Sequence, residues 1–420
     1  MCSNSNLCKY KYAILWVSSK AKQPLPYSFY NGIDKFFKYF KKETKKSAKD
    51  GLLDEHEADP ISWTLFYVIL QWSLEKVSIL IWVFSVLHWN CMEWSINTGA
   101  LAYHKFQTGD DYIKIRYNKK NSDQAGKNVR DKHVYANPFN PLCCPILALG
   151  VWFSLESTCF GTNTSLFGSS NTEEEAPSKR YTSLLKLLLK TNIETVSKFI
   201  WRNHANGHVI WKGLASFATS GTTCPPSVAS VAAWGEWSMG AVLYVYWHFC
   251  VPEDHFIGRL LSGLDPNKPE FASLPPHFMT GFDPMEYPDI SEAMHLMYGP
   301  ILEQWSGNKE VDPTGLFLFV FALVIYHSKW LQNWITVQPG HPFCLMLFLN
   351  NPKLLIRLKL KITVDLVGQC KHATGIPPHI ENACLCAKML WLFEETLTTV
   401  KALMIQVKEA VKDAFEEKVE

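Results

Sequence analysis

The pattern of apolar and polar positions predicts a chain built mainly from helices. Two strongly apolar segments, 77–89 and 316–326, are shorter than the ~20 residues that a bilayer span requires, and the charged pair Glu75 and Lys76 lies at the start of the first. Further helical periodicity covers 181–202 and 208–250. We therefore expect the two apolar segments to be buried core helices, and we expect no membrane partner.

A period of two predicts one small antiparallel β element among these helices. Residues 112–117 alternate between apolar and polar, a polar turn with Gly126 follows, and 133–135 have β-forming side chains again. Prolines interrupt the pattern elsewhere. Pro24 and Pro26 predict an irregular segment over 1–30, and the many prolines of 263–290 predict a linker.

The last segment, 388–418, repeats its apolar residues every three or four positions. This spacing is typical of a coiled coil, and equally of a single amphipathic helix packed on its own chain; the sequence leaves both open. The repeating residues are Leu390, Phe393, Leu397, Val400, Met404, Val407, Val411 and Ala414.

A lysine-rich helix is expected near the N-terminus, over 31–50. Its lysines at helical spacing favour either contact with DNA phosphates or a solvated helix face. The lysines that would follow DNA are Lys38, Lys42, Lys45 and Lys49.

Composition narrows the classes of function. The formal net charge is only +2, so a nucleic-acid surface must be local. The 12 cysteines show no disulfide or zinc framework, and the apolar run 13–17 is too short for a signal peptide, which favours an intracellular protein. The spacing of Cys370, His372, His379, Cys384 and Cys386 matches no standard zinc finger, and phosphate-binding loops are missing from the sequence, so we expect no metal and no cofactor.

One ordered set of residues carries more information than any of its members. His208 opens a His-x-x-Trp-Lys stretch, Trp237 lies in Gly-Glu-Trp-Ser, and Tyr246 follows nine residues later. In order and spacing this resembles the catalytic core of tyrosine recombinases, which carry His-x-x-Arg, then His or Trp, then Tyr.

Other segments resemble one eukaryotic branch of that family, the recombinases of mobile elements close to the Crypton type. The resemblance extends over about 60–420, and its order and spacing are more specific than any one tripeptide. The segments are 87–94, 123–126, 132–138, 144–149, 254–259, 275–277 and 294–379.

The resemblance implies a mostly α fold with a small antiparallel β element, as in DNA breaking-rejoining enzymes. It divides the chain into a helical N-terminal region with the basic helix (1–76), a recombinase-like core (77–277) and a helical C-terminal extension (278–420) that ends in the possible coiled coil (388–418).

The resemblance also implies roles. Tyr246 matches the nucleophile that attacks a DNA phosphate, His208 a proton-transfer group, and Trp237 a phosphate hydrogen-bond donor. Lys119 or Lys120 lies near the hairpin lysine that protonates the leaving oxygen, although Asn121 occupies the position that fits best.

Three positions depart from the family. Where it has arginines, this chain has Trp94, Trp211 and Trp234. Arginine binds phosphate through a charged planar fork, whereas an indole offers one neutral N–H. In a related phosphoryl-transfer setting a transition-state arginine is worth a factor of ~10³–10⁵. The chain has 16 Trp and only Arg116, Arg130, Arg180, Arg202, Arg259 and Arg357, which favours a biased change of Arg to Trp by mutation, editing or codon reassignment.

The sequence therefore predicts a degenerate tyrosine recombinase of a mobile element, which binds duplex DNA in the nucleus as a homo-oligomer and does not cut it. A second hypothesis is an active recombinase in which Lys212, His208 and the hairpin lysines replace the arginines. A third is a non-enzymatic scaffold that assembles through its C-terminal helix.

Overall fold

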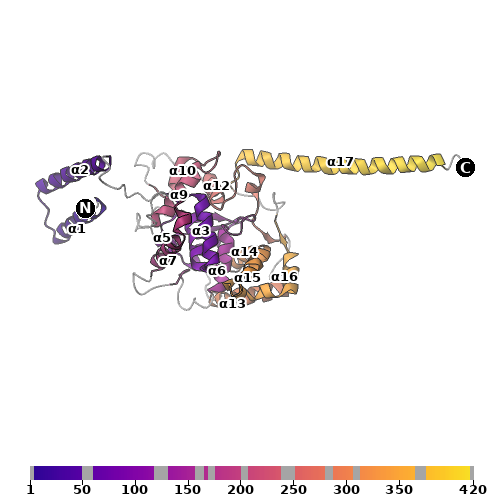
Figure 1. Ribbon diagram of the computed structural model, residues 1–420, viewed down its shortest axis with the longest axis horizontal. Helices are drawn as coiled ribbons and strands as arrows, with labels where there is room; N and C mark the ends of the chain where they lie inside the picture. The colour runs from indigo at the N-terminus through magenta and orange to yellow at the C-terminus, as the bar shows by residue number, and fades with distance from the viewer. Residues whose placement is uncertain are drawn as a thin grey trace. The chain divides into compact units, whose positions relative to one another are not determined.

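The computed structural model describes residues 4–49, 60–117, 131–156, 165–168, 176–199, 207–237, 251–279, 287–305, 313–364 and 375–416 (Figure 1). Its contacts divide the chain into two compact units, Met1–Glu57 and Ala58–Glu420. Each unit is described by itself.

The N-terminal unit is a pair of helices, α1 (Asn4–Ala21) and α2 (Tyr27–Lys49). An ion pair of 2.8 Å between Lys11 Nζ and Asp34 Oδ1 joins them. The expectation of an irregular segment over 1–30 was wrong. Pro24 and Pro26 lie between the helices, where the missing N–H of proline breaks no helical hydrogen bond.

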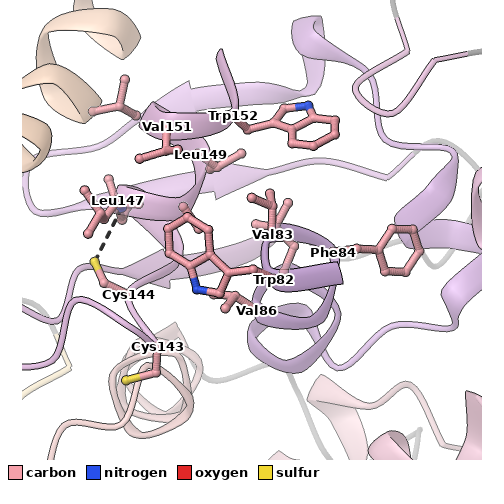
Figure 2. Close-up of a cluster of buried hydrophobic side chains, with 14 of the residues drawn as sticks. Trp82, Val83, Phe84, Val86, Cys143, Cys144, Leu147, Leu149, Val151 and Trp152 are labelled. Atoms are coloured by element: carbon pink, nitrogen blue, oxygen red, sulfur yellow. Dashed lines mark hydrogen bonds between the residues drawn. The ribbon is translucent and has the colours of Figure 1, made fainter. Parts of the chain in front are cut away.

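The core of the second unit is formed by three apolar helices, α4 (Ile79–Cys91), α6 (Pro145–Leu155) and α14 (Pro313–Tyr326). Every residue of α4 except Leu80 is buried. The close-up in Figure 2 shows side chains of α4 and α6, among them Trp82, Phe84 and Trp152, meeting in this core. The prediction that the two apolar segments are core helices is confirmed, because α4 and α14 contain them.

Helices α6 and α14 approach each other closely at one glycine. A Cβ on Gly150 would lie 2.9 Å from Cγ2 of Val324 and 3.0 Å from the carbonyl oxygen of Val320. At such distances any larger residue would push the two helices apart.

A small antiparallel sheet lies beside these helices. Strands β1 (Phe106–Thr108), β2 (Tyr112–Ile115) and β3 (Lys132–Tyr135) pair in the order β1-β2-β3. The register places Ile113 opposite Val134. The predicted hairpin is confirmed, and β1 is an addition that the sequence pattern did not predict. Helices make up 70% of the residues that the structure describes, so the expected class, mostly α with a small antiparallel sheet, is correct.

The remaining elements complete the second unit. They are α3 (Trp63–Glu75), α5 (Ser95–Gly99), η1 (Tyr103–Lys105), α7 (Pro177–Thr191), α8 (Ile193–Val196), α9 (Gly207–Ser220), α10 (Val228–Trp234), α12 (Val251–Leu261), η3 (Pro269–Ala272), β4 (His277–Phe278), α13 (Pro288–Trp305), α15 (Ser328–Val337), η5 (Pro342–Leu345), η6 (Leu347–Asn350), α16 (Pro352–Lys359), β5 (Ile362–Thr363) and α17 (Pro378–Glu416).

The described part of the expected linker, up to residue 279, is packed into the body of the unit. Leu264, Phe271 and Leu274 are buried. Arg259 Nη1 donates to the carbonyl oxygens of Phe271 (2.9 Å) and Ser273 (3.0 Å), so a buried guanidinium holds this proline-rich stretch in place. The linker prediction was therefore wrong for these residues.

The contacts do not divide the second unit at residue 277, since α14 packs on both α6 and β1. Among the described helices, none is by itself long and apolar enough to cross a membrane; α14 and α15 pass that test only as a pair bent by 59°.

Candidate functional site

Three tryptophans that are far apart in the sequence meet in the second unit. Trp94 and Trp211 have ring centroids 5.6 Å apart, and Trp211 and Trp237 meet edge to face at 4.8 Å. Trp94 is 40% exposed, while Trp211 and Trp237 are half-buried. We call Trp94, Trp211 and Trp237 the tryptophan cluster. It brings together three positions that the recombinase resemblance selects.

Local backbone features position each ring. Helix α4 ends at Met92 in the left-handed conformation (φ 49°), and the chain then turns so that Trp94 precedes α5. On α9, Gly213 lets Trp211's helix approach residue 61, because a Cβ there would lie 2.0 Å from the carbonyl oxygen of Ile61. These features place the backbone at two of the three tryptophans.

The third ring follows α10. Ser227 caps the start of that helix by accepting from the Ser230 amide. Glu236 takes a positive φ of 58°, and the Trp237 amide donates to the carbonyl oxygen of Ala232 at 2.8 Å. This tight end of α10 turns Trp237 back toward Trp211.

A buried lysine lies close to these residues. Lys132 on β3 donates from Nζ to the carbonyl oxygen of Trp234, and its Nζ lies 5.1 Å from the centroid of the Trp234 ring. The same Nζ lies 3.6 Å from Glu93 and 3.5 Å from Glu236. Lys132 and Glu93 side chains are 1% and 3% exposed. Two carboxylates thus share one ammonium group inside the protein.

The neighbouring groups are not activated nucleophiles. Burial raises the pKa of the Cys91 thiol to about 12 and raises the pKa of Tyr117 well above its usual value. Both stay protonated near neutral pH. In the described residues, the buried indole N–H groups of Trp211 and Trp234 have no hydrogen-bond acceptor. The cluster is therefore an apolar surface beside a buried charge cluster, without the phosphate-binding fork of an arginine.

Several sequence-predicted site residues lie outside the described residues, namely Tyr246, Lys119 and Lys120. His208 belongs to α9, but its side chain is not described. Lys212 is half-buried on α9, next to Trp211.

The expected DNA-binding lysines all belong to α2, in the N-terminal unit. Lys38 and Lys42 are exposed, while the side chains of Lys45 and Lys49 are not described. At least two of these lysines can therefore reach a ligand from solvent.

A second polar cluster joins β3 to α12. His133 Nδ1 donates to the Asp254 carboxylate, and the Tyr135 hydroxyl donates to Nδ1 of His255. The backbones touch at Gly258, where a Cβ would lie 2.1 Å from the carbonyl oxygen of His133.

An arginine completes the polar cluster. Arg259 Nη2 donates to Asp111 at 2.6 Å, with both side chains at most 1% exposed, and its guanidinium lies 4.5 Å from the Tyr135 ring centroid. Burial, helped by the neighbouring Arg259 charge, lowers the pKa of His255 to about 4. His255 is therefore neutral at pH 7, and its Nδ1 can accept a hydrogen bond from the Tyr135 hydroxyl.

His133, Tyr135 and Arg259 lie in segments that resemble the recombinases, but the sequence predicted no role for them. The available signal was the spacing of His255 and Arg259, which puts both side chains on one face if the segment is helical. No group of three side chains able to hold a metal ion occurs among the described residues.

Comparison of the chain with protein-family models, curated proteins and solved structures gives no match.

Proposed function

We propose that this chain is a DNA-binding relative of the tyrosine recombinases in which tryptophans at the arginine positions have abolished efficient DNA cleavage. One observation carries the proposal. Trp94, Trp211 and Trp237 were selected by motif order along the sequence, and their rings contact one another in space. A recombinase active site requires the two arginine positions and the His-or-Trp position to lie around one phosphate, and the ring contacts among these three positions support that arrangement.

The chemistry follows from the side chains at those positions. Cleavage needs two positive charges on the non-bridging oxygens of the phosphate. The tryptophan cluster offers neutral rings, and the buried cation Lys132 is already shared by Glu93 and Glu236, which adjoin Trp94 and Trp237 in sequence. We infer that a phosphate placed here would receive little transition-state stabilisation, while binding to duplex DNA elsewhere on the protein would persist.

DNA binding is tested by its dependence on salt. The full chain is expected to bind a random-sequence duplex and to lose affinity steeply between 50 and 200 mM salt, on the order of 10³-fold if about six phosphates are contacted. Lys38→Glu with Lys42→Glu on α2 should weaken binding at 50 mM salt and flatten the salt dependence.

The matched control is Lys186→Glu with Lys190→Glu, which are exposed lysines at the same spacing on α7. Equal weakening by both double variants would contradict the role of α2. A chain that fails to bind any duplex at low salt would contradict the proposed function.

The exposed side of α17 favours a second candidate function, that of a scaffold protein that assembles without acting on DNA. Large apolar residues such as Leu390, Phe393 and Met404 are exposed along this helix. A homo-oligomer without salt-dependent DNA binding would favour the scaffold over the recombinase relative.

A further inference from the structure

Helix α17 extends well beyond the part that packs on its own chain. It has 39 residues, and Figure 1 shows it as one unbroken helix. Ile380 is buried against η3 and Cys384 is packed beside it. Every described side chain from 385 to 412 is exposed.

The exposed part of α17 has a regular apolar seam. With Leu390 at heptad position a, the apolar residues alternate between a and d without interruption. They are 43–68% exposed, although such residues are ordinarily buried. The seam consists of Leu390, Phe393, Leu397, Val400, Met404, Val407 and Val411.

The seam is open along its whole length. At 3.6 residues per turn, Ile380 and Cys384 fall at heptad positions e and b, on a different side of α17 from the seam. The body of the second unit therefore does not obstruct a helix that approaches the seam.

The length of the seam restricts what can cover it. It runs for about 33 Å at 1.5 Å per residue. Among the described helices, α1 and α13 are shorter than this, with 18 residues each. α2 has 23 residues, but its apolar positions end at Phe40, and lysine-rich sequence follows. A partner with an uninterrupted heptad seam of the same length is α17 of a second copy.

The residue types at a and d indicate how many copies meet. Positions a hold Leu390, Leu397, Met404 and, at the end of the seam, Val411; positions d hold Phe393 and the β-branched Val400 and Val407. In the central heptads, leucine or methionine at a with β-branched side chains at d favours three or four parallel strands over two.

The flanking positions agree with a wide, parallel seam. Positions g hold the uncharged Met389, Thr396 and Leu403, so the apolar stripe is wider than a/d alone. In a parallel arrangement the g residues meet e residues of the neighbour, namely Glu394, Lys401 and Lys408. No like charges face each other, and the lysine stems can cover the apolar g side chains.

We propose that α17 assembles the chain into a parallel coiled coil of more than two copies, with four expected. This inference is independent of the proposed DNA-binding function, since every residue that carries it lies on α17. An apparent mass near four times the 48.0 kDa protomer is expected from light scattering of the full chain at micromolar concentration. A mass of three or four copies supports the proposal, and a mass of one or two overturns it.

A matched pair of variants tests whether the seam is the interface. Leu397→Glu with Met404→Glu places charges at two a positions, and Thr398→Glu with Ile405→Glu places the same charges one residue further along, at b. All four side chains are exposed, so neither variant disturbs packing within the protomer. The seam variant should fall about fourfold in mass, to the monomer, while the control keeps its mass. Equal behaviour of the two variants overturns the proposal.

Cys386 distinguishes a parallel from an antiparallel arrangement of the α17 helices. It is an exposed free cysteine at position d, so a parallel coil brings Cys386 of neighbouring copies together, and an antiparallel coil separates them. Diamide, which accepts the two electrons and two protons released by a pair of thiols, should form a disulfide-linked dimer on a non-reducing gel. The cross-link should persist in Cys384→Ser and disappear in Cys386→Ser. Its absence in the assembled native chain overturns the parallel arrangement.

Discussion

The polar cluster around Arg259 and the tryptophan cluster differ in how their buried groups are satisfied. Arg259 donates to Asp111 and to two backbone carbonyl groups, so one guanidinium group binds three acceptors. Beside the tryptophan cluster, Lys132 serves both Glu93 and Glu236. The first region joins one cation to a carboxylate and two carbonyl groups, while the second places one cation between two carboxylates, next to neutral rings.

This difference shows what arginine contributes at a buried position. Its five donors can satisfy a carboxylate and backbone carbonyls at the same time, whereas an indole has a single donor. Arg259 holds the proline-rich stretch onto α12. At Trp94 and Trp211 the two rings pack on each other, and neither indole can supply the positive charge of a guanidinium.

The largest effect is expected from breaking the Arg259 network. Arg259→Met removes the ion pair to Asp111, whose side chain is 0% exposed, and so breaks a buried salt bridge from one side. Removing one partner of a buried pair costs about 3–5 kcal/mol. Chemical denaturation should show this loss in the free energy of unfolding. A loss below about 1 kcal/mol would mean that the Arg259 network is dispensable.

A somewhat smaller loss is expected from Lys132→Met. Glu93 would lose its buried cation, but the side chain of Glu236 is 14% exposed and can turn toward water. We expect a loss of about 3 kcal/mol, at the lower end of the range for broken buried pairs. Asp111→Asn, which leaves Arg259 buried without its charged partner, is the matched comparison. If Lys132→Met were as stable as the native chain, the two carboxylates would not need their ammonium partner.

The polar cluster should also respond to acid. Because the folded-state pKa of His255, about 4, lies below its usual 6.5, the unfolded chain binds the proton more tightly. Stability that is present above pH 6.5 is thus lost as the pH falls toward 4. From pH 7 to 4.5 this amounts to about 2 kcal/mol.

His255→Phe tests this response. At pH 7 the variant should be less stable by about 1 kcal/mol, through the lost hydrogen bond with Tyr135. At pH 4.5 the order should reverse, because phenylalanine takes up no proton. Denaturation curves at both pH values measure the crossing, and parallel pH profiles for the two proteins would rule out His255 as the cause.

The smallest effect is expected at the exposed edge of the tryptophan cluster. Trp94→Arg removes one ring contact with Trp211 from a side chain that is already 40% exposed. Such a contact contributes about 0.5–1.5 kcal/mol, so the loss in unfolding free energy should stay near 1 kcal/mol. A loss of several kcal/mol would show that Trp94 is a core residue.

The core helices and the hairpin could be predicted because local pattern determines them. Residues 79–91 are apolar on every side, and Tyr112–Ile115 alternate before a polar turn. β1 has only three residues, too few to show a period of two. The predictions of an irregular N-terminus and of a linker were wrong because prolines were taken to exclude helices and packed structure nearby. Pro24 lies after the end of α1, and the carbonyl oxygen of Phe271 is bound by Arg259, a contact that no local pattern contains.

The candidate site also has one part that the sequence could predict and one part that it could not. The tryptophan cluster could be expected from the sequence, because the resemblance to the recombinase motif assigns a role to each of its three positions. The shared use of Lys132 by Glu93 and Glu236 depends on the meeting of β3, the end of α4 and the end of α10, which only the three-dimensional fold provides.

The most direct test of the central claim is covalent trapping on a pool of nicked DNA duplexes. Three proteins are compared, namely the native chain, the Trp94→Arg/Trp211→Arg variant, and that variant with Tyr246→Phe. If tryptophan at the arginine positions is what prevents cleavage, the double variant alone forms a protein–DNA adduct, and Tyr246→Phe removes it. An adduct formed by the native chain would contradict the account, as would failure of the folded double variant to form one.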